Sequence, residues 1–391
     1  MRRYYSGSDF TKALNIYELA SLAKKRLPHF AWEYLEGGSE DEITISRNRH
    51  AFEKIGFNPQ TLIPCDQVET NCQVFGKSYH YPMAIGPTGY NGMLWLDADI
   101  LQAKAAASLG IPYTMTTVST SSLEEIREAA PEVELWFQLY TLRERKIQFD
   151  LMKRALAVGC KTLFLTSDAV VLGKREWDKR NFVAPQQLSW RNKFDVVRHP
   201  RWMLQALWPK GIPTLGNLNP YLPDGNKTAA GAAHFMGNQM DRSLDWNALA
   251  QIREKWPHQL VLKGVQSPAD AERCIAMGMD GVVVSNHGGR QLDGAPASIE
   301  SLPEVAAVAK GKLTIFLDSG IRRGSDIVKA RALGADMVLI GRAGLYGAAV
   351  GGEAGIRHAL QILAEEMKLT MALIGRPSLP QLNASCVRPL L

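Results

Sequence analysis

The sequence predicts a closed (β/α)8 barrel, or TIM barrel, with an N-terminal helical extension and a long insertion after the fourth strand. Short apolar segments alternate with helical patterns along most of the 391 residues, as expected for a parallel sheet with crossover helices. Eight such segments favour a closed barrel over an open sheet. The predicted strands are 81–86, 111–116, 133–140, 162–166, 260–263, 281–285, 313–318 and 337–341.

Helix signals lie between these strands. Residues 121–124 (Ser-Ser-Leu-Glu) offer a capping box, and Pro268 after Ser267 predicts a capped helix start. Residues 246–256 carry an apolar stripe at helical spacing. Ahead of the barrel, residues 17–37 predict helices and residues 51–75 predict irregular or β structure.

The chain divides into three predicted parts. Residues 1–80 form an N-terminal extension and barrel cap, 81–376 form the barrel and 377–391 form a tail. The fourth and fifth strands are much farther apart than any other successive pair, which places an insertion at 176–240. Residues 174–212 hold nine Lys and Arg against three acidic residues, together with four of the nine tryptophans. This excess equals the formal net charge of the whole chain, +6.

The composition is that of a globular protein. With 46% hydrophobic and 21% charged residues, the chain is not disordered, collagen-like or coiled coil as a whole. Its five cysteines lack metal-binding or CxxC spacing, so we expect free thiols in a reducing compartment and no metal site. Neither a signal peptide nor an apolar run of about 18 residues is present, so no membrane span is predicted.

Polar residues follow every predicted strand, at the end where barrels build their active sites. Glycine-rich turns with Arg322 and Arg342 after the last two strands predict a phosphate-bearing ligand held at helix amino termini. The alternative is a pair of turns with solvated arginines. Residues 86–92 lack the spacing of a dinucleotide-binding loop, and a Walker lysine is missing.

A second group of residues indicates acid–base chemistry. His287 follows the sixth strand and is a candidate general base. Asp168, at the end of the fourth strand, is a candidate partner for the imidazole. Arg290 and Arg175 offer guanidinium groups for a carboxylate, because Arg binds planar anions in bidentate fashion. For Arg175 a surface charge in a basic loop is an equal alternative.

Lys263 lies inside an apolar strand, where a charge is costly unless it faces an anion. Three interpretations remain open. Lys263 could stabilise negative charge on a reduced flavin ring, pair with a core carboxylate, or form a Schiff base as in barrel aldolases.

Three motifs together resemble the FMN-dependent (S)-2-hydroxy acid oxidase and dehydrogenase family. They are residues 285–293 (Ser-Asn-His-Gly-Gly-Arg-Gln-Leu-Asp), 318–324 (Asp-Ser-Gly-Ile-Arg-Arg-Gly) and 340–342 (Ile-Gly-Arg). The likeness extends over residues 15–380. It includes 27–28 (Leu-Pro), 34–38 (Tyr-Leu-Glu-Gly-Gly), 138–140 (Gln-Leu-Tyr) and 165–168 (Leu-Thr-Ser-Asp).

The resemblance implies an enzyme that binds FMN at the strand ends. The implied FMN contacts are Pro87, Thr88, Gly89, Thr116, Gln138, Thr166, Lys263 and Ser285. The implied phosphate contacts are Asp318, Ser319, Gly320, Arg322, Gly341 and Arg342. The implied contacts of the substrate carboxylate are Arg175, Arg290, Tyr34 and Tyr140, although core packing is a strong alternative for Tyr34.

The resemblance also implies a reaction. His287 takes a proton from the 2-hydroxy acid, FMN accepts the two electrons, and the product is a 2-oxo acid. Lys263 stabilises the reduced ring and Asp168 the imidazolium, with Tyr140 as a further catalytic residue. Transfer as a hydride and transfer through a carbanion both remain open.

Short segments and single residues that resemble particular branches of the family imply the substrate and the electron acceptor. Residues 86–95 and 341–347 are most similar to the mandelate dehydrogenase branch. Val118 stands where glycolate oxidases carry Trp, which implies room for a bulky substrate such as (S)-mandelate. Gly89 replaces the Ala common in oxidases, which implies a quinone-type acceptor rather than O2. Residues 215–222 are similar to bacterial L-lactate dehydrogenases.

Several alternatives therefore stay open. They are an L-lactate dehydrogenase, an oxidase that uses O2, a non-oxidising FMN barrel isomerase or nucleotide dehydrogenase, and a non-enzymatic barrel that binds anions or membranes.

The family resemblance also bears on the insertion. Membrane-associated members carry their membrane-binding segment after the fourth strand, and mixed basic and aromatic residues suit an anionic lipid surface. This implies a cytoplasmic enzyme, peripheral on the inner face of the cell membrane. A lid with a solvated basic face is the alternative, and nucleic-acid binding is disfavoured because no recognised motif accompanies the charge. The family further implies a homo-oligomer, a tetramer.

Overall fold

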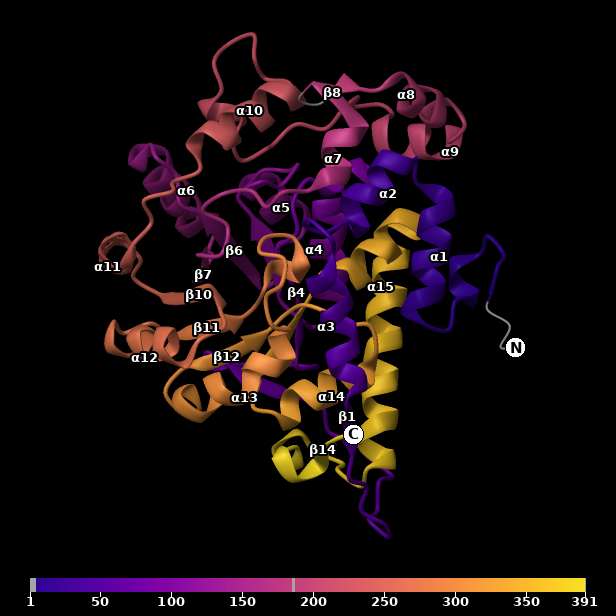
Figure 1. Cartoon of the computed structure of the whole chain (residues 1–391), viewed down its shortest axis with the longest axis vertical. Helices are drawn as coiled ribbons and strands as arrows, with labels where there is room; N and C mark the ends of the chain where they lie inside the picture. Colours follow the sequence, from indigo (N-terminus) through magenta and orange to yellow (C-terminus); the bar gives the residue numbers. More distant parts are fainter. Residues whose placement is uncertain (1–4, 185–186, 391) are drawn as a thin grey trace.

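The computed structural model describes residues 5–184 and 187–390, and it confirms the eight-stranded barrel (Figure 1). The strand order β10-β11-β12-β13-β4-β5-β6-β7 is closed. Each predicted strand lies within two residues of an observed one at both ends. The strands are β4 (Met83–Ile85), β5 (Tyr113–Thr116), β6 (Leu135–Tyr140), β7 (Thr162–Thr166), β10 (Gln259–Val265), β11 (Gly281–Val284), β12 (Thr314–Leu317) and β13 (Met337–Ile340).

Eight helices follow these strands and surround the barrel. They are α4 (Ala98–Ser108), α5 (Leu123–Ala129), α6 (Arg145–Ala157), α11 (Trp246–Lys255), α12 (Pro268–Ala276), α13 (Ser298–Ala309), α14 (Gly324–Ala332) and α15 (Arg342–Leu373). The capping box of α5 joins Ser122 and Glu125, one residue later than predicted. Pro268 begins α12 as predicted, but the side chain of Ser267 makes no capping hydrogen bond.

The N-terminal extension lies outside the barrel. It contains η1 (Phe10–Lys12), α1 (Ile16–Arg26), α2 (His29–Glu36), α3 (Ile43–Glu53), β1 (Ile55–Phe57), β2 (Cys72–Val74) and β3 (Lys77–Tyr79). Helix α3 was not predicted, and its last residues replace part of the irregular segment expected from residue 51. Its N-cap, Glu42, has a left-handed backbone and makes no side-chain capping bond, so the sequence carries no start signal there.

Aromatic side chains fill the amino end of the barrel. Trp136 lies 5.4 Å from Phe164 between ring centroids, inside the strand layer. Phe75 and Tyr79, from the β2–β3 hairpin, pack on this group at 5.9 Å from Phe316 and 6.2 Å from Trp136. This end is therefore solid core, and the carboxyl ends of the strands remain available for a site.

The insertion lies between β7 and α11. Its elements are α7 (Glu176–Asn181), β8 (Phe182–Ala184), β9 (Gln187–Leu188), α8 (Trp190–Val197), α9 (Pro200–Trp202), the π-helical turn η3 (Met203–Leu207), η4 (Asn219–Tyr221) and α10 (Ala229–Gln239). Figure 1 shows it along the top of the molecule, beside α2. The Trp202 indole donates to the Met93 carbonyl at 2.8 Å, and Gly216 N–H donates to the Ser119 carbonyl at 3.0 Å. The insertion is thus attached to the loops that follow β4 and β5.

The last residues return to the N-terminal extension. Two short turns, η6 (Leu379–Gln381) and η7 (Ala384–Cys386), lead into β14 (Val387–Pro389), which pairs antiparallel with β1. Over the described part of the chain, none of the helices combines the length and the apolar character needed to cross a bilayer.

Candidate active site

A cavity of about 330 Å³ opens at the carboxyl ends of the barrel strands. Most of the residues predicted for the site line it, although they come from positions far apart in the chain. They are Tyr34, Pro87, Thr88, Gly89, Thr116, Val118, Tyr140, Arg175, Lys263, His287, Arg290, Asp318, Ser319, Gly320, Arg322, Gly341 and Arg342. The other predicted residues do not line the cavity. Gln138, Asp168 and Ser285 are each hydrogen-bonded to a residue that does, and Thr166 is hydrogen-bonded to Gln138.

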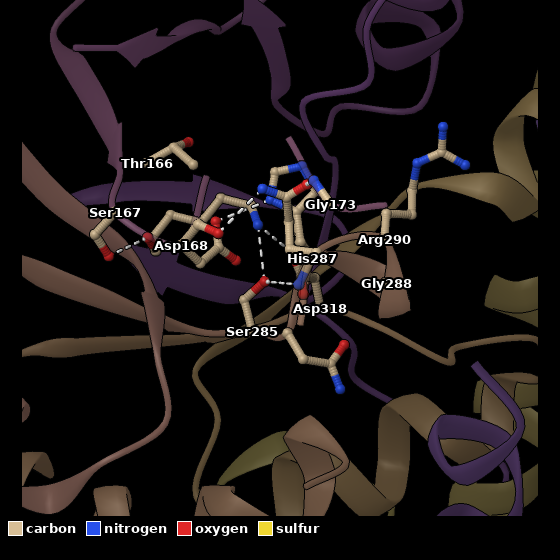
Figure 2. Close-up of polar contacts among 12 residues, drawn as sticks. Thr166, Ser167, Asp168, Gly173, Ser285, His287, Gly288, Arg290 and Asp318 are labelled. Atoms are coloured by element: carbon tan, nitrogen blue, oxygen red, sulfur yellow. Dashed lines mark hydrogen bonds and ion pairs between the residues drawn. The ribbon is translucent and has the colours of Figure 1, made fainter. Parts of the chain in front are cut away.

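His287 begins a short turn, η5 (His287–Gly289), directly after β11. Its backbone is left-handed, with φ of 58°, a conformation that is uncommon for residues with a side chain. The turn is held by Ser285 Oγ, which accepts from His287 N–H at 3.0 Å. This conformation directs the imidazole to Asp168, whose Oδ1 lies 2.9 Å from His287 Nδ1 (Figure 2).

The protonation states of this pair follow from burial and charge. Burial lowers the pKa of His287, and Lys263 adds to this effect while Asp168 opposes it. Burial raises the pKa of Asp168, but His287 and Lys263 act against it, and the net direction is down. An anionic carboxylate only accepts hydrogen bonds, so Nδ1 carries the proton that faces Asp168. Nε2 of the neutral ring is then free to accept a proton.

Lys263 pairs with the carboxylate of Asp318, as one of the three interpretations of its sequence position expected. Its Nζ lies 3.0 Å from Asp318 Oδ2 and donates to Ser285 Oγ at 2.8 Å. Burial lowers the pKa of Lys263, yet Asp318 and Asp168 raise it more. The ammonium group therefore stays charged, which disfavours a Schiff-base lysine. Since Lys263 and Asp318 both line the cavity, the pair also presents charge to a bound molecule.

Arg290 is a partly buried cation without a carboxylate partner among the described residues. One of its terminal nitrogens donates to the carbonyls of Tyr34 and Gly37, at 2.9 Å and 2.7 Å. Burial, with Arg175 and Arg342 nearby, lowers the pKa of Arg290 to about 9. A bound carboxylate would reverse this effect. In Figure 2 the guanidinium points away from His287 and Asp168, so the base and the anion site are distinct.

Two tyrosines and a second arginine line the cavity together with Arg290. The Tyr34 hydroxyl donates to the Gly89 carbonyl at 3.1 Å, so Tyr34 belongs to the site rather than to the core alone. Burial raises the pKa of Tyr140 to about 12, so its phenol is a neutral donor. Arg175 lines the cavity and contacts Asp178 at 3.9 Å. Its position excludes the interpretation as a charge on the outer surface.

Arg342 lies close to Arg290, since both donate to the Gly37 carbonyl, and Arg322 lies beside Tyr346. Arg342 donates to the carbonyls of Leu35 and Gly288, at 3.0 Å and 2.9 Å, and burial lowers its pKa. Arg322 donates to the Tyr346 hydroxyl at 3.2 Å. Both arginines stand beside the first turns of α14 and α15, where free N–H groups and the helix dipole favour an anion.

The residues present fit a phosphate-bearing cofactor. A Cβ at Gly344, in the first turn of α15, would meet nothing within 4 Å, and one at Gly341 would meet only Thr88 Cγ2, at 3.7 Å. The start of α15 therefore has open space beside its backbone. Deeper in the barrel, Gln138 bridges the hydroxyls of Thr116 and Thr166. That polar row suits the heteroatoms of a flat ring.

One wall of the cavity was not predicted from the sequence. It is apolar and comes mainly from the insertion, through Leu172, Leu215, Ala229, Ala233, Met236, Gly237 and Met240. Ala229, Ala233 and Gly237 are spaced four apart on α10 and therefore share one helix face. That spacing is the signal in the sequence, but small residues carry no chemistry of their own. The insertion thus contributes to the site as well as to the surface.

The lowered pKa of His287 predicts how activity depends on pH. A protonated imidazole cannot accept the substrate proton, so kcat/KM should be constant near neutrality. It should fall as the pH drops through a pKa below the usual histidine value of about 6.5. Steady-state rates between pH 5 and 8 measure this. An acid limb centred above pH 7 would contradict the assignment.

Comparisons with known proteins agree with this geometry. The sequence profile of the FMN-dependent dehydrogenase family matches residues 23–389. (S)-Mandelate dehydrogenase of Pseudomonas putida is 42% identical over 370 residues, 94% of this chain and 92% of the relative. L-Lactate oxidase of a Nostoc species is 39% identical over 378 residues, 95% and 97% of the two chains. The crystal structure of the monotopic membrane protein (S)-mandelate dehydrogenase has 41% identity and a TM-score of 0.92, over 97% of this chain and 100% of that one.

Proposed function

The chain belongs to the FMN-dependent dehydrogenase family, and on this premise we propose that it oxidises (S)-mandelate or a similarly bulky (S)-2-hydroxy acid to the 2-oxo acid. We further propose that it passes the electrons to a quinone-type acceptor at a membrane. The observation that carries the proposal is that one cavity holds three features: a partly buried guanidinium with no carboxylate partner among the described residues, a neutral histidine and an apolar wall.

Each part of a 2-hydroxy acid has a complementary group in the cavity. Arg290, with Arg175 on the same wall, suits the carboxylate. The neutral Tyr140 and Tyr34 phenols suit the carboxylate and hydroxyl oxygens. The apolar wall from α10, together with Val118, suits a large hydrocarbon side chain. This apolar area favours a mandelate-like substrate over lactate, whose methyl group would leave much of it exposed.

The chemistry divides between the cofactor and the chain. FMN, when bound, accepts the two electrons of the oxidation. His287 receives a substrate proton at Nε2, and Asp168 stabilises the resulting imidazolium through the bond to Nδ1. Lys263 holds a positive charge at its Nζ beside the cavity. Arg290 and Arg175 fix the carboxylate so that the substrate presents one face to the base.

Anaerobic mixing of the holoenzyme with (S)-mandelate, L-lactate and (R)-mandelate tests the function. We expect (S)-mandelate to bleach the flavin absorbance fastest and (R)-mandelate to leave it unchanged. Faster bleaching by L-lactate would overturn the substrate assignment and leave the reaction class intact. Absence of bleaching by either (S)-compound would overturn the reaction class.

The surface of the insertion supports membrane association. Trp190, Phe194 and Val197 lie on one face of α8 and are exposed by 84%, 68% and 67%. An ordinary surface helix turns its apolar face inward, whereas α8 presents this face to solvent. Lys193 lies 4.9 Å from the Trp190 ring centroid, an arrangement suited to the boundary between headgroups and acyl chains. The solved relative described as a monotopic membrane protein supports the same proposal.

A triple substitution on this surface should abolish membrane binding. Replacing Trp190, Phe194 and Leu204 by Ser removes exposed apolar area without touching the cavity lining. We expect the variant to lose sedimentation with vesicles rich in anionic lipid and to keep flavin reduction. A matched control replaces Leu62, Leu369 and Leu373 by Ser. These three leucines are also largely exposed but lie outside the insertion, so this variant should sediment as the wild type does. Unchanged sedimentation of the Trp190, Phe194 and Leu204 variant would favour the alternative, in which the insertion is a lid over the active site.

A further inference from the structure

Asp99 is a completely buried carboxylate that forms no ion pair within the described chain. It lies in the first turn of α4. Its Oδ1 accepts from Asn91 Nδ2 at 2.8 Å and from the Tyr113 hydroxyl at 3.3 Å. Its Oδ2 accepts from the N–H and the hydroxyl of Thr120, at 2.9 Å and 2.6 Å. All four partners are donors, which suits a group that only accepts.

The two oxygens of Asp99 hold two different loops. Asn91 belongs to the loop after β4, and the same Nδ2 also donates to the Thr88 carbonyl at 2.7 Å. Thr120 belongs to the loop after β5, and its Oγ1 accepts from Gly92 N–H at 3.1 Å. One carboxylate therefore joins the loops at the ends of neighbouring barrel strands. Burial of a carboxylate among neutral donors is costly. This cost indicates that the link between the two loops matters for the site.

The joined loops carry two neighbouring residues that line the cavity, Gly89 and Val118. Tyr90 N–H donates to the Val118 carbonyl at 3.0 Å, directly beside Gly89. A Cβ at Gly89 would lie 2.6 Å from Val118 Cγ2, so the loops approach each other to less than the thickness of a methyl group. A small shift of either loop therefore changes the shape of the site at this point.

We propose that Asp99 is a positioning residue that fixes the spacing between Gly89 and Val118, and thereby the preference of the site for a bulky substrate side chain. Asp99 does not line the cavity, so it acts through Asn91 and Thr120. The inference rests on the proposed function, because the preference is stated for 2-hydroxy acids.

Asp99→Asn tests the proposal with almost no change in shape. The amide nitrogen replaces one acceptor, so either Asn91 with Tyr113 or the two donors of Thr120 lose their partner. We expect the ratio of kcat/KM for (S)-mandelate to that for L-lactate to fall at least tenfold. FMN content and the acid limb of the pH profile should stay at wild-type values, since the His287–Asp168 pair is untouched.

Thr120 supplies an independent pair of variants. Thr120→Val removes the hydroxyl that Asp99 and Gly92 share and should lower the same ratio. Thr120→Ser keeps the hydroxyl and should retain the wild-type ratio. Asp245→Asn is the matched control, because Asp245 caps the exposed start of α11 and Asn caps a helix equally well.

Binding of non-reacting acids separates this inference from the proposed function. The affinities of the holoenzyme for phenylacetate and acetate, read from the flavin spectrum, report the preference without turnover. We expect Asp99→Asn and Thr120→Val to lower the phenylacetate to acetate ratio, even if neither hydroxy acid bleaches the flavin. Ratios within twofold of the wild type in both variants, or a loss of FMN that accompanies the change, would overturn the proposal. If Asp99→Asn does not fold, the Thr120 pair decides.

Discussion

Replacing His287 by Asn is expected to lower kcat by about 10² to 10⁴-fold, the usual contribution of a positioned general base. An amide nitrogen can still donate to Asp168 Oδ1, but the group cannot accept a proton at the position of Nε2. Asn also tolerates the left-handed backbone at this position, so the turn after β11 should survive. The rate of flavin bleaching by (S)-mandelate in single turnover measures the effect.

The FMN content of the His287→Asn variant must be measured alongside its rate, because loss of FMN would also abolish turnover. We expect wild-type FMN content, because His287 contacts Ser285 and Asp168 rather than Arg322 and Arg342, the proposed phosphate contacts. His258→Asn, in an exposed loop, is the matched control and should be fully active. If His287→Asn kept most of the wild-type turnover, another group would have to be the base.

Replacing Arg290 by Lys is expected to lower kcat/KM by one to two orders of magnitude, mainly through KM. Lysine keeps the charge but loses the planar fork that matches a carboxylate. A hydrogen bond to a charged group contributes about 1.5–3 kcal/mol, which sets the size of the effect. The acid limb of the pH profile should remain, since His287 and Asp168 are unchanged.

Arg47→Lys is a matched control for this substitution. Arg47 also donates to two loop carbonyls, those of Gly294 and Ala295, at 2.9 Å and 2.6 Å, but it lies outside the cavity. It should leave KM unchanged. A KM for Arg290→Lys equal to that of the wild type would remove Arg290 from the carboxylate site.

The barrel was predictable because its strands are buried on both faces and read as continuous apolar segments. Helix α3 was not, since Glu42 provides no capping signal. The convergence of His287 with Asp168 followed from the rule that carboxyl ends of barrel strands meet at one mouth. The structure places the two side chains 2.9 Å apart, although they are 119 positions apart in the sequence.

Other features could not be predicted, for three physical reasons. The partners of Arg290 and Arg342 are backbone carbonyls, most of them at the end of α2. Every residue has a carbonyl, so no sequence pattern marks these partners. The wall from α10 uses Ala233 and Gly237, whose role is to leave space. Asp99 is a third case, because a carboxylate bound by neutral donors resembles an ordinary surface residue in the sequence.

The carboxyl end of α2 has a consequence for how the enzyme assembles. Its last carbonyls accept hydrogen bonds from Arg290, the proposed carboxylate contact, and from Arg342, a proposed phosphate contact. The negative end of the helix dipole favours both cations there. Helix α2 is synthesised early, whereas Arg290 and Arg342, which bind its last carbonyls, are synthesised near the end of the chain. A chain without α2 would lack these carbonyl partners, and we expect neither arginine to keep its observed position there.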